Sequence, residues 1–136
     1  MAISSISLAD DLAVALGLER ALIGGLLCGL TAEEMPSLRV EEFALERHRV
    51  IWDVMVALRS EGLHPDLVTV RMRLRQQDRL ADAGGEEYLV GLWGDEGMIA
   101  MHLDQYAQQV RALATAREMR RLGMEIGALI RADRSV

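Results

Sequence analysis

The side chains that could do chemistry in this chain are three histidines, one cysteine and two acidic pairs. His48, His64 and His102 lie far apart, and no two of them have the i, i+4 spacing that places two zinc ligands on one helix face. Cys28 is the only cysteine, so it has no partner for an intramolecular disulfide or a thiolate cluster. It lies in an apolar helical pattern without a neighbouring base, which predicts a small buried side chain. We therefore expect no catalytic residue, no metal site and no cofactor.

The acidic pairs and the clustered arginines have simpler interpretations than catalysis or nucleic-acid binding. Glu41-Glu42 and Glu86-Glu87 stand at expected helix starts, where carboxylates suit the positive end of the helix dipole. This interpretation is favoured over general acid–base catalysis. The arginines at positions 71, 73, 75 and 79 could form a basic patch, but a solvated helix face is favoured because acidic residues dilute any local field.

Charge and residue usage exclude further classes of function. The net charge is −6 and all 15 basic residues are arginine. Without lysine the chain can have neither a P-loop lysine nor a Schiff base. An acidic domain is also a weak autonomous binder of nucleic acid, because phosphate contacts supply most of that affinity. The N-terminus has no signal-peptide pattern and no apolar run reaches about 18 residues, so we expect a cytoplasmic protein without a membrane partner.

Hydrophobic periodicity predicts an all-α fold, a small bundle of about six helices with a long protruding C-terminal helix. Apolar residues make up 51% of the chain, and they recur at helical rather than strand spacing. We divide the chain into a helical globular body, residues 1–101, and a long helix, residues 102–136. Gly17 is expected to kink or break the first helix, and residues 94–97 are expected to form a loop. The helices are expected near residues 8–16, 18–28, 46–61, 67–77, 86–93 and 102–132.

Inward faces follow from the same spacing. The first helix should bury Leu12 and Leu16, and Phe43 should fill the core as a single plug. Asp66 or Thr69 should cap the helix that follows Pro65. The other residues expected in the core are Leu22, Ile23, Leu26, Leu27, Val50, Ile51, Val54, Met55, Leu58, Leu67, Val70, Leu74, Tyr88, Leu89 and Leu92.

The last helix, from His102 to Ala132, is too long for the body that precedes it. About 30 helical residues span roughly 45 Å, whereas about 100 residues fold into a body only about 35 Å across. Its first part, to about Leu113, should pack on the body, and its far end should project. An apolar stripe on a projecting helix predicts self-association. The residues we assign to that interface are Leu113, Met119, Leu122, Ile126 and Leu129.

Several stretches carry a family resemblance in their order and spacing. They are Leu18–Leu27, Glu41–Phe43 followed by His48-Arg49-x-Ile51-Trp52, Pro65–Val70, Leu80-x-x-x-Gly84-Gly85-x-x-Tyr88-Leu89, and Tyr106-Ala107-x-x-Val110-Arg111 with Arg117. Over about residues 18–130 this pattern resembles the N-terminal domain of bacterial DnaB-type replicative DNA helicases. Two features differ. The family usually opens with a proline-containing arm, unlike residues 1–17, and it usually has glycine where Asp78 stands, so that helix is expected to end differently here.

The resemblance implies a helical bundle with a protruding hairpin, of which residues 102–136 would be the first arm. In that family the hairpins pair between subunits, and the domains form a collar on a hexameric ring. The collar binds the helicase-binding domain of the primase, and loader proteins act on the ring. The family's ATPase domain, with its P-loop, has no counterpart in these residues.

Three hypotheses about function follow. The leading one is a non-catalytic assembly and partner-docking domain of a replicative helicase, with itself and a primase or loader as partners. The second is a free-standing adaptor or regulator that mimics this domain and binds helicase or primase. A reading frame that continues beyond Val136 into a P-loop would favour the first, and a stop codon the second. The third is an unrelated small enzyme using His48 or His102.

Overall fold

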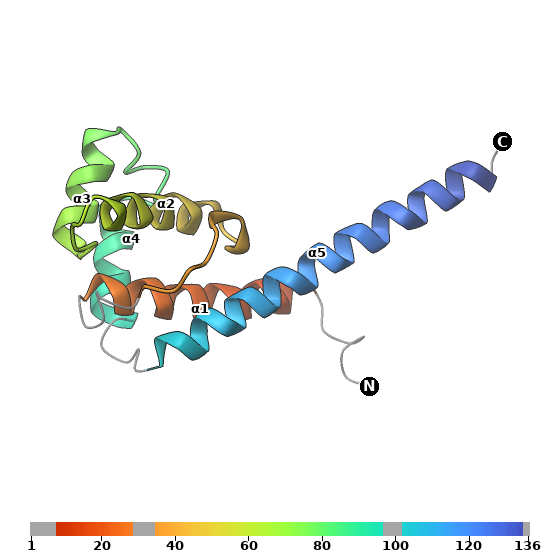
Figure 1. The fold of residues 1–136 in the computed structure, drawn as a ribbon, viewed down its shortest axis with the longest axis horizontal. Helices are drawn as coiled ribbons and strands as arrows, with labels where there is room; N and C mark the ends of the chain where they lie inside the picture. Colours follow the sequence, from red (N-terminus) through yellow and green to blue (C-terminus); the bar gives the residue numbers. More distant parts are fainter. Residues whose placement is uncertain (1–7, 29–34, 97–101, 135–136) are drawn as a thin grey trace.

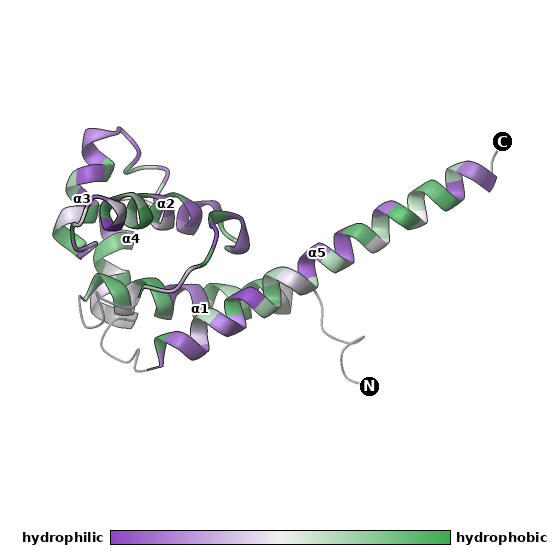
Figure 2. Ribbon diagram, viewed as in Figure 1, coloured by the Kyte–Doolittle hydropathy of each residue, from purple (hydrophilic) through white to green (hydrophobic). Residues whose placement is uncertain are grey.

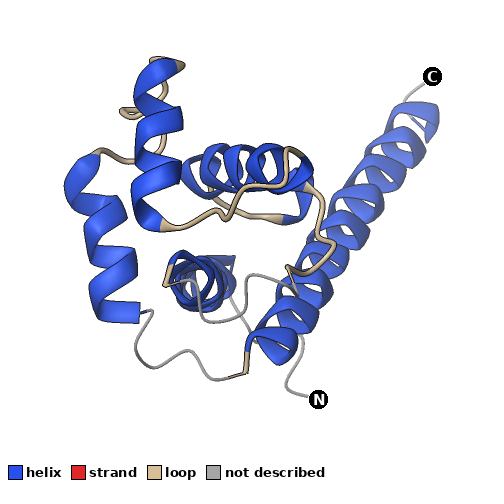
Figure 3. Ribbon diagram, turned by 60° about the vertical axis from the view of Figure 1, so that its left-hand side comes forward, coloured by secondary structure: helices blue, strands red, loops and turns tan. Residues whose placement is uncertain are grey.

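The structure, a computed structural model, describes residues 8–28, 35–96 and 102–134, and within these ranges every regular element is a helix. Four α-helices and two short helical turns make a body, and the fifth α-helix runs along the body and then extends well beyond it (Figure 1). Figure 3 shows the body helices grouped around α1, which is seen almost end-on. The elements are α1 (Leu8–Leu27), the 3₁₀ turn η2 (Val40–Glu42), α2 (Glu46–Ser60), α3 (Leu67–Gln76), α4 (Glu86–Gly91), the π-helical turn η3 (Leu92–Glu96) and α5 (Leu103–Arg134).

The expected break at Gly17 is wrong, because α1 continues through it as one helix of 20 residues. A helical glycine costs about 1 kcal/mol relative to alanine. Gly17 is exposed and has nothing within 4 Å of its Cβ position, so only this modest local cost opposes the helix. Burial of the second half of α1, including Leu22 and Ile23, outweighs it. The first half is less covered than expected, since Leu12 is 40% exposed and Leu16 is only half-buried.

The rest of the predicted core is confirmed with two exceptions. The residues expected inside from the second half of α1 and from α2, α3, α4 and η3 are buried in one cluster, except Leu67 and Tyr88, which are half-buried and pack against it. Phe43 is fully enclosed, with its ring centroid 4.9 Å from that of Trp52. Asp66 is the residue that caps α3, because its carboxylate accepts a hydrogen bond of 2.8 Å from the Thr69 amide. The core side chains that pack the helices together are thus largely aliphatic, as expected for a chain with 4% aromatic residues.

Two local predictions near the end of α4 need correction. The loop expected at residues 94–97 is helical as far as Glu96, because η3 follows α4 directly. Buried Leu89 and Leu92 anchor this segment on both sides of Gly91, so tertiary packing overrides its weak helix propensity. Cys28 is half-buried rather than fully enclosed, because it follows the last residue of α1. Its Sγ lies 3.5 Å from the backbone oxygen of Trp93, and burial raises the pKa of its thiol.

The end of α3 has the same geometry as the end of α2, contrary to the expectation from Asp78. After α2, Gly62 has φ +80° and the amides of residues 62 and 63 bond back to Arg59 and Leu58. After α3, Asp78 has φ +55° and the amides of residues 78 and 79 bond back to Arg75 and Leu74. Both are Schellman motifs, in which the left-handed residue is usually glycine. Aspartate therefore occupies a conformation that costs an L-residue about 1–2 kcal/mol, less for Asp than for most.

We expect Asp78→Gly to raise the free energy of unfolding by up to about 1 kcal/mol. Relief of the left-handed strain exceeds the extra conformational freedom that glycine gives the unfolded chain. The matched change Gly62→Asp should lower the free energy of unfolding by about 1 kcal/mol, since it creates the same strain one helix earlier. Urea unfolding followed by circular dichroism measures both. If both variants shift the midpoint in the same direction, left-handed strain is not what limits these two helix ends.

The long helix α5 is half anchored and half projecting. Over its first turns Leu103, Ala107 and Val110 are buried against the body, where α5 packs along α1 and touches η2. Beyond these turns it leaves the body (Figure 1). Its 32 residues correspond to about 48 Å of helix. The predicted protruding C-terminal helix is confirmed, whereas the division into domains at residues 101 and 102 stays a prediction.

Candidate assembly surface and the networks that position it

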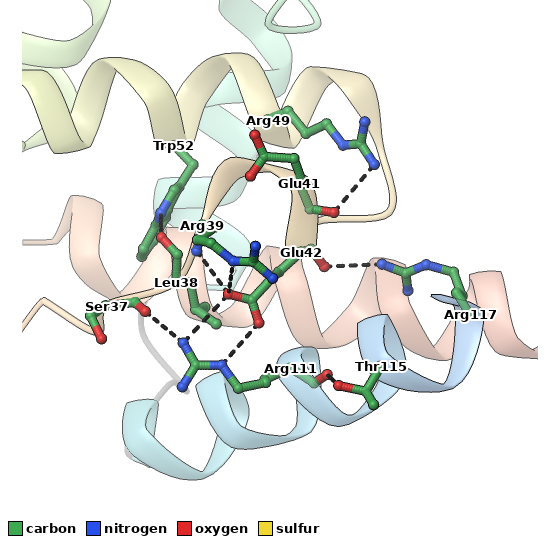
Figure 4. A network of polar contacts seen from close by, with 10 residues as sticks. All are labelled: Ser37, Leu38, Arg39, Glu41, Glu42, Arg49, Trp52, Arg111, Thr115 and Arg117. Carbon is green, nitrogen blue, oxygen red and sulfur yellow. Dashed lines mark hydrogen bonds and ion pairs between the residues drawn. The ribbon is translucent and has the colours of Figure 1, made fainter. Parts of the chain in front are cut away.

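One carboxylate fixes the direction in which α5 leaves the body. Glu42 closes η2, and its side chain is only 7% exposed. Its Oε2 accepts a hydrogen bond of 2.9 Å from Nε of Arg111 on α5, and its Oε1 accepts one of 2.9 Å from the Arg39 amide (Figure 4). Its backbone oxygen accepts a further bond of 3.0 Å from Arg117, almost two turns along α5. Arg111 and Arg117 of α5 thus both form hydrogen bonds with Glu42 of the body. These contacts oppose rotation and tilting of α5 relative to the body.

The same arginine also holds the extended segment before η2. Nη2 of Arg111 donates to the backbone oxygen of Ser37 at 2.5 Å, while the indole N–H of Trp52 donates to that of Leu38 at 2.9 Å (Figure 4). Residues 37–42 are therefore clamped between α2 and α5. The prediction that the Glu41-Glu42 pair serves a helix dipole missed this role of Glu42. Its long-range partner is 69 residues away, and sequence spacing alone cannot identify such a pair.

The network makes the stability of the fold depend on pH through Glu42. Burial acts to raise the pKa of this carboxyl, but hydrogen bonds from Arg111 and the Arg39 amide, with the charges of both arginines, lower it overall. A group whose pKa is lower in the folded state contributes stability above its unfolded pKa, and that contribution is lost as the pH falls through the folded pKa. The unfolded value for glutamate is about 4.3.

Acid should therefore destabilise the native chain more steeply than a Glu42→Gln variant. Between about pH 5 and pH 3 the native urea midpoint should fall further than that of Glu42→Gln, since the variant has no carboxylate to protonate at this position. At neutral pH the variant should already be the less stable of the two. Urea midpoints measured at several pH values test this, with Glu41→Gln, an exposed neighbour, as the matched control. Parallel midpoint curves for the native chain and Glu42→Gln would contradict the assignment.

The projecting half of α5 carries large apolar side chains that nothing in the described chain covers. We call Met119, Leu122, Ile126 and Leu129 the α5 stripe. These side chains are 69%, 44%, 58% and 71% exposed, respectively. Figure 2 shows the apolar residues recurring along this half of the helix. The 3-4-3 spacing of the stripe is the a/d pattern of a helix that packs against another helix.

The stripe does not continue the side of α5 that packs on the body. Because successive residues turn by about 100° around a helix, the stripe centres about 110° from the side that buries Leu103, Ala107 and Val110. Met124, also 69% exposed, lies about 180° from the stripe centre. Leu113 is half-buried and lies about 160° away, so it is a weaker candidate for the interface and stays a prediction. A helix that covered the stripe would approach α5 from a direction about 110° around the helix from the body-packed side.

A charged flank runs beside the stripe. Arg121 bonds both Glu118 and Glu125, one turn before and one turn after it, at 2.5 Å each. These pairs raise the pKa of Arg121 and, for Glu118, lower the pKa of the carboxyl through its hydrogen bond to Arg121. Exposed pairs at this spacing support a solvated helix only weakly, but they keep that side of α5 polar. The α5 stripe is therefore bordered on one side by charged residues, while Met124 lies on the opposite side of the helix.

The clustered arginines of α3 and of the turn that follows it form ion pairs with acidic side chains. Arg71 and Arg75 both pair with Glu86, at 2.9 and 2.8 Å. Arg73 pairs with Glu61 at 2.7 Å, and Arg79 with Asp53 at 2.9 Å. These ion pairs neutralise most of the local positive charge, which argues against a basic patch for nucleic acid.

A buried polar chain links three helices, and sequence reasoning missed it. His48, with no exposed surface, lies with Nδ1 2.7 Å from Oε1 of Glu19 and with Nε2 2.5 Å from the Tyr88 hydroxyl. Glu19 is 1% exposed, and its other oxygen accepts a hydrogen bond of 2.8 Å from the Ala44 amide. A carboxylate only accepts, so the Nδ1 proton points to Glu19, and Nε2 forms the hydrogen bond with the Tyr88 hydroxyl. Each of Glu19, His48 and Tyr88 belongs to one of the stretches that carry the family resemblance, and this was the available signal.

This chain of side chains suits structure better than catalysis. Burial raises the pKa of Tyr88, against the charges of Arg20 and Arg47, so its hydroxyl stays protonated rather than becoming a nucleophile. Both guanidinium groups lie over its ring, at 5.3 and 4.8 Å from the centroid. Glu19 and His48 are enclosed, and a substrate could reach them only if the bundle opened.

The other candidate ligands stay apart. His64 and His102 are exposed, and the structure does not bring either of them to His48. Within residues 8–28, 35–96 and 102–134, no three His, Cys, Asp or Glu side chains are grouped so that they could hold a metal ion. In the same ranges no helix is both long and apolar enough to cross a membrane.

The fold and its surfaces define a class, an all-α domain that presents one uncovered apolar helix and whose buried polar groups fasten its elements together. Comparison with known proteins gives the family. The chain belongs to the DnaB-like helicase N-terminal domain family, whose sequence model matches residues 12–112. The resemblance inferred from the sequence and the all-α prediction are thereby confirmed.

Individual relatives agree with this assignment. The chain is similar to the crystal structure of the N-terminal domain of DnaB helicase from Mycobacterium tuberculosis, with a TM-score of 0.74 and 27% identity, over 83% of this chain and 79% of that one. It is also 32% identical over 73 residues to the replicative DNA helicase DnaB of Leifsonia xyli subsp. xyli (strain CTCB07). That match covers 52% of this chain and only 16% of the relative's length.

Proposed function

We propose that this chain is a non-catalytic assembly and partner-docking domain that acts in a replicative DNA helicase. The observation that carries the proposal is the α5 stripe, four large apolar side chains on a helix anchored to the body through Glu42. Large exposed apolar surfaces on a folded domain usually mark interaction sites. The family membership and the relatives named as DnaB helicases supply the biological setting. Parent ATPase activity, a ring collar and docking of primase or a loader are parts of this proposal.

The proposal assigns self-association to the α5 stripe. A second copy would lay its own stripe against Met119, Leu122, Ile126 and Leu129, with knobs-into-holes packing of the 3-4-3 spacing. The stripe lies about 110° around α5 from the body-packed side and continues beyond the body (Figure 1), so a second helix can reach its outer residues. Glu42, Arg111 and Arg117 then act as positioning residues, since they set the direction of the helix that presents the stripe.

The experiment is sedimentation equilibrium of the chain over a concentration series. We expect a reversible monomer–dimer equilibrium that strengthens in moderately higher salt, because the contact is mainly apolar. A chain that stays monomeric at high micromolar concentration would remove support for self-association through α5. A free-standing adaptor remains the second candidate. It is separated from the first by sequencing the reading frame after Val136, where a P-loop segment favours a helicase and a stop codon favours the adaptor.

A further inference from the structure

A second uncovered surface lies on the body, between the extended segment before η2 and the end of α2. The extended segment 35–39 crosses α2 and leaves a groove of about 490 Å³ against the last turns of that helix. Met35, Pro36, Leu38 and Val56 give the groove an apolar lining. Val56 is 43% exposed, although Val54, Met55 and Leu58 beside it on α2 are buried in the core. The groove is held open by the Trp52 and Arg111 hydrogen bonds that fasten the backbone of Leu38 and Ser37 (Figure 4).

Two guanidinium groups stand at the groove, and among residues 8–28, 35–96 and 102–134 no carboxylate lines it. Arg39 has a side chain that is 79% exposed, and it makes only a long contact of 3.7 Å with Glu42. Arg59 also lines the groove, and no acidic side chain within the described ranges pairs with it. By contrast, the arginines of α3 are each matched to a carboxylate. In a chain of net charge −6, two arginines left at an apolar groove form a local charge that a partner can match.

We propose that this groove binds a short protein segment in which an apolar side chain is flanked by aspartate or glutamate. The apolar side chain would pack on Val56, and the flanking carboxylates would take hydrogen bonds from Arg39 and Arg59. Guanidinium groups bind carboxylates through paired N–H donors, which fixes orientation as well as adding affinity. This inference rests on the partner-docking part of the proposed function and deepens it by naming the chemistry of the partner.

Nucleic acid fits the groove less well than an acidic peptide. Single strands bind through aromatic side chains on which bases stack and through a continuous basic track. This groove has an aliphatic lining and two positive charges. The remaining surface of an acidic chain would repel a polyanion.

Selection of a phage-displayed library of random short peptides on the immobilised full chain tests the inference. We expect enrichment of peptides in which Leu, Ile, Phe or Met lies next to Asp or Glu. A synthetic peptide of the enriched sequence should bind at least about tenfold more weakly to Val56→Glu and to Arg59→Gln, and more weakly as salt rises. Val68→Glu is the matched control, because Val68 is 56% exposed on α3 and does not line the groove.

The possible failures are distinguishable. No enrichment, enrichment of basic peptides, or equal binding to Val56→Glu and the native chain would overturn the inference, and so would a labelled single-stranded oligonucleotide that binds in an Arg59-dependent way. Sedimentation of the same variants keeps the proposed function separate. Val56→Glu should leave self-association unchanged, whereas a change of the α5 stripe should leave peptide binding unchanged.

Discussion

Replacing Leu122 and Ile126 together by glutamate is expected to weaken self-association of the chain at least about 1,000-fold. Burying one such aliphatic side chain contributes about 1.5–3 kcal/mol, and a symmetric pair buries each of them twice. A 1,000-fold change corresponds to only about 4 kcal/mol, so the expectation is conservative. Both residues are exposed in the single chain, at 44% and 58%, and their replacement should therefore leave the fold intact. Sedimentation equilibrium and circular dichroism measure the two effects.

Met124→Glu is the matched control for this double variant. Met124 is on the same helix and is 69% exposed, but it lies about 180° around α5 from the stripe. It should leave the association constant within a few-fold of the native value. If Met124→Glu weakens association as much as the double variant does, the contact is not confined to the stripe. If the double variant associates like the native chain, the contact lies elsewhere on the molecule.

The projecting helix shows what sequence periodicity could predict and why. Helix length and the spacing of its apolar residues are local properties, so Leu103 and Val110 could be placed in the core and Leu122 and Ile126 outside it. Comparing the length of the helix with the size of the body was enough to predict that it projects. The exposure of the α5 stripe follows from the length of the helix relative to the body and from the spacing of its apolar residues. Its occupancy by a second copy remains the proposal to be tested.

The residues that position the helix could not be predicted in the same way. Glu42 and Arg111 are 69 positions apart, and nothing in their spacing indicates an ion pair. From its sequence neighbours alone, Glu42 was predicted only to favour the helix dipole, as one of two acidic residues near a helix start. Gly17 shows the opposite error, in which a local helix-breaking signal was given more weight than the burial of the turns that follow it. The local spacing of apolar residues predicted most of the helices, whereas the polar contacts between helices became visible only in the structure.

Replacing Glu19 by leucine is expected to lower the free energy of unfolding by about 3 kcal/mol, a large fraction of the stability of a small domain. The carboxylate accepts hydrogen bonds from the ring of His48 and from the Ala44 amide, and both donors would lose their buried acceptor. An unpaired buried polar group costs more than its hydrogen bond contributes, because water cannot replace the lost partner. Urea unfolding measures the loss. Glu118→Gln, on the solvated flank of α5, is the control and should cause no measurable change.

The double variant Glu19→Leu/His48→Leu distinguishes the cost of losing the Glu19–His48 hydrogen bond from the cost of changing the shape of the core. If the cost of Glu19→Leu arises from the unsatisfied His48 ring, removing that ring as well should cost less than the sum of the two single changes. Well-packed apolar replacements of buried pairs are often tolerated better than the loss of one member. Tyr88→Phe should cost about 1–3 kcal/mol, because it removes the hydrogen-bond partner of an enclosed His48 ring nitrogen. Additive single costs for Glu19 and His48 would mean that shape, and not their hydrogen bond, holds α1 against α2.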